Sequence, residues 1–312
     1  MKPTFVVDDR GVLTPLPNST ISTGSIANVI AVHPANTFVY VVNALSDSLS
    51  MYALGAGGIL TPLSQATVAT GSYLTSIAIH PTGSFAYVVN QFENTVSMFA
   101  IGANGIFTPL STSTVATPSR PTQIAINSAG TYAYVTNYID KSISMYAIAS
   151  NGILTPLTPS TVRTETIISS IVIHPAGSFA YANSDRAISM FSIGTNGQLT
   201  PLNTPSITTQ NVSWFMAVHP AGTYAYTLGQ NHNISMYSIG NDGMLAPLST
   251  PSIILNDGTS PIGMAIDSAG RFVFTAAYGY GISTFAIGSN GILTPPAVPM
   301  STGTVRGFAI SH

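Results

Sequence analysis

Few side chains in this 312-residue chain can carry charge-based chemistry, because only 6% of the residues are Asp, Glu, Lys or Arg and cysteine is absent. Arg120, Arg163 and Arg306 are the candidates for holding an anionic ligand, since the guanidinium group pairs well with carboxylate and phosphate. His232 and Glu165 are the candidates for proton transfer, because imidazole and carboxylate groups serve as general acids and bases. These five residues form the catalytic and anion-binding hypothesis.

Further charged residues lie in short polar segments that follow strand-like runs of Val, Ile and Tyr. These additional ligand-binding candidates are Glu93, Asp140, Lys141, Asp185 and Arg186. A simpler explanation is also open, because loops carry most of the charge of any protein. Under that explanation Arg163 and Glu165 pair with each other at the surface, as do Asp185 and Arg186, and such pairs stabilise little.

Several classes of function are disfavoured. Without cysteine there is neither a disulfide nor thiolate chemistry. The sequence has no metal-ligand spacing, no nucleophile elbow and no phosphate-binding glycine loop, so we expect no metal and no cofactor. The net charge of −2 with no basic stripe argues against a nucleic-acid partner. No apolar run approaches the roughly 18 residues needed to cross a membrane.

A repeated turn-and-strand motif, Gly-x-Leu/Phe-Thr/Ala-Pro, indicates how these side chains are positioned. Its glycines recur at intervals of 45 to 48 residues, at Gly11, Gly58, Gly105, Gly152, Gly197, Gly243 and Gly291. Seven copies of about this length are typical of the four-stranded blades of a propeller. We therefore expect residues 1–312 to form a single all-β domain, a seven-bladed β-propeller with four-stranded antiparallel blades.

One repeat unit shows the expected strands. Strand A covers residues 76–80, strand B 84–90 and strand C 95–101, and a hairpin through Asn104-Gly105 leads into strand D. The alternation of apolar and polar residues and the content of Val, Ile, Thr and Tyr exclude a helix. His33, His80, His174 and His219 share one repeat position at the end of strand A, where other copies have Asn127, Asp267 and Ser311. We expect them to hydrogen-bond backbone groups at a turn rather than to catalyse.

The two chain ends contribute incomplete copies of the repeat. Residues 4–7 align with strand C, residues 12–16 with strand D and residues 307–310 with strand A, while strand B has no counterpart. We expect the seventh blade to be closed by N- and C-terminal strands and to lack one strand. Three explanations stay open: a trimmed chain, a three-stranded blade, or a strand added by another molecule, which would give strand-mediated self-association. Of these we favour the three-stranded blade.

The segment Tyr134-Val135-Thr136-Asn137, with its upstream Ala129-Gly130 turn and the downstream Asn151-Gly152-Ile153-Leu154-Thr155-Pro156-Leu157, resembles the YVTN-repeat or lactonase-like family of seven-bladed β-propellers. The resemblance covers essentially the whole chain. It implies the propeller fold but no single activity, because the family includes 6-phosphogluconolactonases, muconate-lactonising enzymes and surface proteins without assigned chemistry.

In a propeller the B-to-C and D-to-A connections share one face, here called the loop face, and the A-to-B and C-to-D turns share the opposite turn face. All of the candidate residues above are expected on the loop face. We favour a secreted or cell-surface binding scaffold whose loop face holds a protein or glycan. The alternative is a lactonase-type hydrolase acting on a small anionic sugar lactone, which we would place in the cytoplasm.

Overall fold

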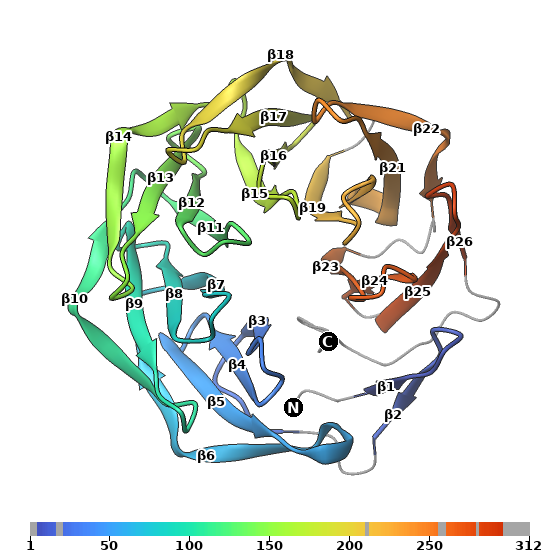
Figure 1. Ribbon diagram of the computed structural model, residues 1–312. Helices are drawn as coiled ribbons and strands as arrows, with labels where there is room; N and C mark the ends of the chain where they lie inside the picture. Colours follow the sequence, from blue (N-terminus) through green and yellow to red (C-terminus); the bar gives the residue numbers. More distant parts are fainter. Residues whose placement is uncertain (1–4, 17–20, 210–211, 255–259, 279–280, 296–312) are drawn as a thin grey trace.

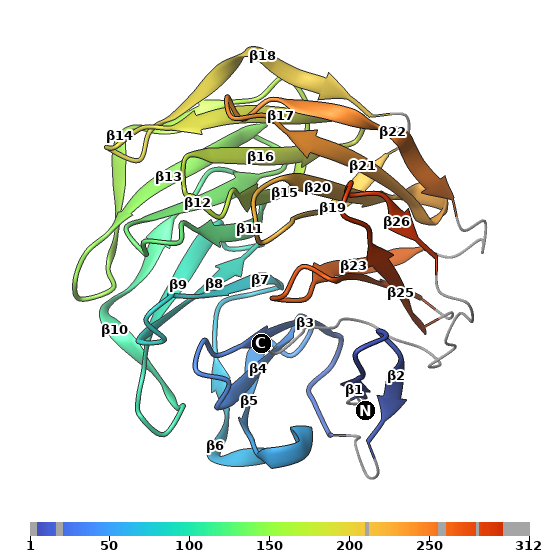
Figure 2. The ribbon, with the colours of Figure 1, turned by 45° about the vertical axis from the view of Figure 1, so that its right-hand side comes forward.

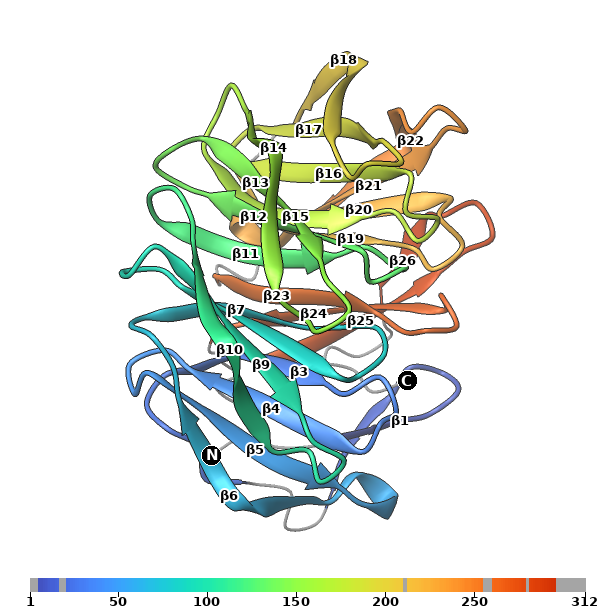
Figure 3. The ribbon, with the colours of Figure 1, turned by 60° about the vertical axis from the view of Figure 1, so that its left-hand side comes forward.

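The computed structural model describes residues 5–16, 21–209, 212–254, 260–278 and 281–295. Six four-stranded antiparallel sheets stand around a central axis, with the first strand of each sheet innermost and the last outermost (Figure 1). Figure 3, which shows the blades closer to edge-on, shows their connections on two opposite faces. No helix among the described residues is long and apolar enough to cross a membrane.

The blades are numbered 1 to 6 in chain order, with strands A to D in each. Blade 1 consists of β3 (Ala27–Val32), β4 (Phe38–Asn43), β5 (Ser48–Leu54) and β6 (Leu60–Ala69). Blade 2 consists of β7 (Leu74–Ile79), β8 (Phe85–Asn90), β9 (Thr95–Ile101) and β10 (Phe107–Ala116). Blade 3 consists of β11 (Pro121–Ile126), β12 (Tyr132–Asn137), β13 (Ser142–Ile148) and β14 (Leu154–Arg163).

The remaining blades repeat this order. Blade 4 consists of β15 (Ile168–Ile173), β16 (Phe179–Ser184), β17 (Ala187–Ile193) and β18 (Leu199–Thr208). Blade 5 consists of β19 (Ser213–Val218), β20 (Tyr224–Gly229), β21 (Asn233–Ile239) and β22 (Leu245–Ile254). Blade 6 consists of β23 (Pro261–Ile266), β24 (Phe272–Ala277), β25 (Gly281–Ile287) and β26 (Leu293–Thr294). The described residues also form two 3₁₀ turns, η1 (Ala56–Gly58) and η2 (Gln230–His232).

The predicted number of blades is wrong. The described residues form six four-stranded blades, and β1 (Phe5–Val7) pairs only with β2 (Leu13–Pro15) in a separate two-stranded sheet. This sheet lies between blade 6 and blade 1 (Figures 1 and 2). The reason is that the N-terminal segment supplies only two short strands and the sequence holds no seventh copy of strand B. The predicted C-terminal strand at 307–310 lies outside the described residues.

Apolar side chains fill the spaces between neighbouring blades. One cluster joins Tyr87, Val89 and Met98 of blade 2 to Ile124 and Val135 of blade 3, and equivalent clusters occur at other junctions. Because each sheet is covered on both sides, the central strands have apolar residues on both faces rather than strict alternation. The core therefore consists of repeated layers between the blades.

Repeated polar groups also connect each blade to the next. The strand-B tyrosine hydroxyl donates to the carbonyl of the C-to-D turn glycine of the following blade. These bonds are Tyr40 to Gly105 (3.1 Å), Tyr87 to Gly152 (2.8 Å), Tyr134 to Gly197 (3.0 Å), Tyr181 to Gly243 (3.0 Å) and Tyr226 to Gly291 (2.9 Å). Burial raises the pKa of each of these phenols well above its usual value. The tyrosine of the repeated motif is thus a link between blades.

Candidate functional site

In blades 1 to 3 the last residue of strand B is an asparagine that fixes the base of the B-to-C loop on the loop face. Asn137 is fully buried, and its Nδ2 donates to Ser142 Oγ (3.1 Å) and Ser144 Oγ (2.9 Å) on the next strand. Asn90 makes the same pair of bonds with Thr95 and Ser97. The B-to-C loops of these three blades therefore project from strand ends held by side-chain hydrogen bonds, and the asparagine of the motif is structural.

Arg120 is held by its backbone between blades 2 and 3. Its N–H donates to Asn94 Oδ1 (2.8 Å), and its carbonyl accepts from the N–H of Tyr138 (2.9 Å). Asp47 Oδ1 accepts from the N–H of Tyr73 in the same way (2.8 Å). The same contact therefore recurs at two junctions and uses only the backbone of the later residue. The side chain of Arg120 takes no part in it.

Blade 3 carries several of the predicted residues along its edge on the loop face. The N–H of Thr164 donates to the carbonyl of Lys141 (2.9 Å), which sets Arg163 and Glu165 beside the loop that carries Asp140. Arg120 enters the same blade from the other side, next to the loop of blade 2 that carries Glu93. We call the set of these exposed side chains the charged cluster: Glu93, Arg120, Asp140, Lys141, Arg163 and Glu165.

The cations of the charged cluster have no acidic partner within the part of the chain that the structure describes. The ion pairs found there join Arg10 to Asp8 (2.9 Å) and Arg271 to Asp267 (3.2 Å) and Asp9 (3.4 Å). The surface pairings considered from the sequence, Arg163 with Glu165 and Asp185 with Arg186, are not formed. Three positive side chains on neighbouring loops are thus available to an anion.

An aromatic pair lies beside the charged cluster. Tyr73 and Phe92 stack with ring centroids 4.5 Å apart and planes 17° apart. The guanidinium carbon of Arg120 lies 6.0 Å from the centroid of Phe92, at the outer limit of a cation–π contact. Leu45, Phe92 and Ile139 hold one loop position in three consecutive blades and are 56%, 57% and 56% exposed. We did not predict these residues, although aligning the loops by repeat position would have revealed them.

The other candidates lie elsewhere. Asp185 and Arg186 are exposed on the loop of blade 4, where the carbonyl of Arg186 accepts from the N–H of Thr209 (2.8 Å). His232 is fully buried in blade 5, with Nε2 3.2 Å from Thr275 Oγ1 of blade 6. Arg306 lies outside the described residues. Among the described residues, no group of His, Asp and Glu is arranged to hold a metal ion.

The six four-stranded blades around a central axis define the protein as a β-propeller, and its described candidate residues lie on the loop face. A family model described as "Lactonase, 7-bladed beta-propeller" matches residues 13–182 and 175–304. The chain therefore belongs to the lactonase family of β-propellers, which confirms the lactonase-like part of the resemblance. No curated protein sequence matches the chain significantly.

Solved structures share the fold at low sequence identity. A Bacteroides fragilis protein provisionally named a 6-phosphogluconolactonase aligns with a TM-score of 0.83 and 19% identity, over 98% of this chain and 92% of that one. A protein from Lactobacillus plantarum gives 0.81 and 18%, over 98% and 93%. A periplasmic gluconolactonase from Pseudomonas aeruginosa gives 0.78 and 16%, over 96% and 92%. At such identities these likenesses describe the fold alone.

Proposed function

We propose that this protein hydrolyses a small anionic sugar lactone at the charged cluster of blades 2 and 3. Membership of the lactonase family is the observation that carries the proposal. The unpaired cations support it, because lactone hydrolysis develops negative charge on the carbonyl oxygen and the proposed substrate carries a further anionic group. This is the alternative that the sequence left open, and the family favours it over a binding scaffold.

The proposed reaction uses the cluster in two roles. Arg120 and Arg163 hold the anionic group and stabilise the oxyanion that forms when water attacks the lactone carbonyl carbon. Glu165 accepts the proton of that water and returns it to the ring oxygen as the ring C–O bond breaks, which leaves a hydroxy acid. We assign the base to Glu165 rather than His232, because His232 is fully buried in another blade.

The test is hydrolysis of glucono-δ-lactone and its 6-phosphate, measured above the spontaneous rate for the wild-type protein, Arg163→Ala, Arg120→Ala and Glu165→Gln. Loss of a charge-assisted hydrogen bond corresponds to roughly a 10- to 100-fold drop in kcat/KM. If an arginine binds the phosphate, its replacement will slow the phosphorylated substrate more than the neutral one. Arg10→Ala, in the exposed pair with Asp8, is the matched control.

Two results would contradict the proposal. One is a wild-type protein that hydrolyses neither lactone faster than buffer does. The other is an Arg10→Ala variant that loses as much activity as Arg163→Ala, because the effect would then come from net charge rather than from a site.

A secreted or surface scaffold that binds a glycan is the second candidate, and the exposed row of Leu45, Phe92 and Ile139 favours it. Aromatic side chains beside an arginine offer both stacking and hydrogen bonding to a sugar. A glycan array should then show binding that Phe92→Ala removes and that Ile59→Ala, an exposed residue near the C-to-D turn of blade 1, does not. The two candidates predict different cellular compartments: the binding scaffold is expected outside the cell or at its surface, and the lactonase in the cytoplasm.

A further inference from the structure

Histidines close four junctions between consecutive blades on the turn face. In each, Nε2 faces the carbonyl of the A-to-B turn glycine of the following blade, a contact called here the histidine latch. The latches are His33 to Gly83 (3.0 Å), His80 to Gly130 (2.9 Å), His174 to Gly222 (2.9 Å) and His219 to Gly270 (3.0 Å). The prediction that these histidines bond backbone groups at turns is confirmed.

Each latch seats the imidazole ring in the same way. Nδ1 accepts from the backbone N–H two residues further on, at 3.1–3.2 Å, and the ring meets an aromatic residue five positions further on edge-to-face. A nitrogen that accepts an N–H must be bare, and one that faces a carbonyl must carry hydrogen, so the Nε2–H tautomer is the form that satisfies both contacts. The fold thus offers a donor, an acceptor and an aromatic wall.

The junction between blades 3 and 4 has the same surroundings without the ring. Asn127 replaces the histidine, and its Oδ1 accepts from the N–H groups of Thr131 and Tyr132, both at 2.9 Å, within its own turn. A Cβ atom added to Gly177 would meet only Ser128 Oγ, at 3.5 Å, whereas one added to Gly130 would meet His80 Nε2 at 2.4 Å. The shorter asparagine therefore leaves the imidazole position open.

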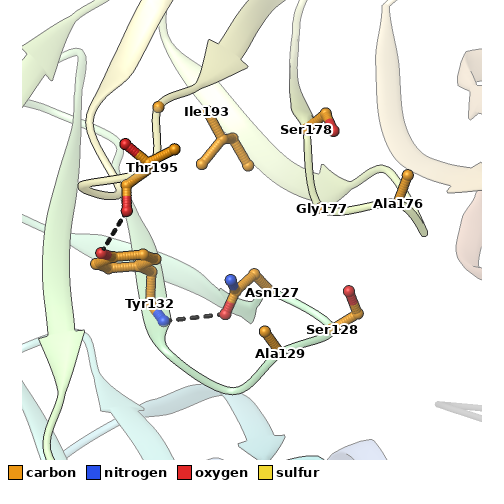
Figure 4. A pocket seen from close by; sticks show the side chains of 10 residues that line it. Asn127, Ser128, Ala129, Tyr132, Ala176, Gly177, Ser178, Ile193 and Thr195 are labelled. Carbon is orange, nitrogen blue, oxygen red and sulfur yellow. Dashed lines mark hydrogen bonds between the residues drawn. The ribbon is translucent and has the colours of Figure 1, made fainter.

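A shallow hollow of about 300 Å³ marks this position (Figure 4). Tyr132 forms one wall and donates its hydroxyl to the carbonyl of Thr195 (2.9 Å), and Gly177 lies across the hollow. Within the described residues, neither the Ala129 N–H nor the Gly177 carbonyl makes a hydrogen bond. These are the two groups that the imidazole bridges at the other junctions. The lining contains no charged side chain.

We propose that this hollow binds a small, neutral heteroaromatic ring of the imidazole type. The ring would accept from the Ala129 N–H, donate to the Gly177 carbonyl and pack against Tyr132. At four other junctions an imidazole ring occupies the equivalent position between the same two backbone groups. At His219 the aromatic neighbour of the ring is likewise a tyrosine, Tyr224. The site lies on the face opposite the charged cluster, so it stands independently of the proposed lactonase activity.

Titration with imidazole, followed by the amide NMR signals of Ala129 and Gly177, tests the proposal at a pH of about 8.5, where free imidazole is neutral. We expect saturable shifts in the millimolar range, given the few atoms of the ligand. 1-Methylimidazole keeps the acceptor but lacks the N–H, so we expect it to bind about tenfold more weakly. Equal binding of the two ligands, or no saturable shift, would overturn the proposal.

Variants of the hollow separate specific from general binding. Asn127→His should fill the position with a fifth latch, raise Tm by about 2–4 °C and abolish the imidazole response. Asn127→Asp keeps the turn closed, as Asp267 does by accepting from the N–H groups of Arg271 and Phe272, and should still respond. Ala176→Leu, at the rim, should block binding without altering the turn. An unchanged response in both Asn127→His and Ala176→Leu would refute the site.

Discussion

Two glycines at the same repeat position allow the energy of a histidine latch to be measured against a matched control. Gly130 has φ +70° and Gly177 has φ +73°, so alanine at either position adopts the left-handed conformation. At Gly130 the new Cβ would lie 2.4 Å from His80 Nε2, whereas at Gly177 the nearest atom, Ser128 Oγ, lies 3.5 Å away. Only the first substitution displaces a latch.

The magnitudes follow from these contacts. The left-handed conformation costs an alanine about 1–2 kcal/mol, and this cost is common to both variants. Gly130→Ala also loses a hydrogen bond of 2.9 Å and overpacks the imidazole, which adds about 2–4 kcal/mol. For a chain of this size the difference corresponds to about 4–8 °C in Tm.

Urea and thermal unfolding, followed by circular dichroism, will measure the two variants side by side. We expect Gly177→Ala to lose about 1–2 kcal/mol and Gly130→Ala about 3–6 kcal/mol. Equal losses in the two variants would refute the reasoning, because the latch would then contribute nothing beyond the conformation of the turn. A larger loss at Gly177 would show that its junction is more tightly packed than the contacts indicate.

Three further predictions concern the repeated polar groups. Tyr87→Phe removes the donor to the Gly152 carbonyl and should lower the free energy of unfolding by about 1–2 kcal/mol in urea titration. Burial raises the pKa of five strand-B phenols, so above a pH of about 10 the unfolded chain releases protons that the folded chain keeps. Stability should therefore fall as the pH rises beyond that value, and less steeply in Tyr87→Phe, as alkaline unfolding curves will show. Asn137→Ala leaves two serine hydroxyls without their donor and should cost about 2–3 kcal/mol, again measured by urea unfolding.

The strands could be predicted from the sequence because local pattern determines them. The expected strand at 95–101 coincides with β9, and the expected strand at 84–90 begins one residue before β8. The number of complete blades could not be predicted from the repeat count, because a turn motif such as that at Gly11 recurs whether or not two inner strands accompany it. The count of turns measures hairpins, and a hairpin is half a blade.

The partners of the repeated residues could not be predicted, because they lie in the next blade. His80 was recognised as a turn residue, yet its Nε2 bonds a glycine 50 positions away. The charged cluster was likewise predicted only as a set of residues on one face. Its location at blades 2 and 3 depends on backbone contacts between loops, such as Thr164 with Lys141, that no local pattern specifies.

The sequence of blade 3 differs from the other repeats at two places, one on each face, and the two differences have different structural consequences. On the loop face, Arg163 and Glu165 are additions to exposed segments, which the scaffold tolerates without further change. On the turn face, Asn127 removes a link between blades 3 and 4. A compensating link exists in strand A, where Gln123 Oε1 accepts from the Ile171 N–H at 2.6 Å, while Ser76 accepts from Ile124 at 3.3 Å one junction earlier. The longer glutamine side chain holds the junction without the latch, so the hollow at Asn127 is compatible with a stable ring.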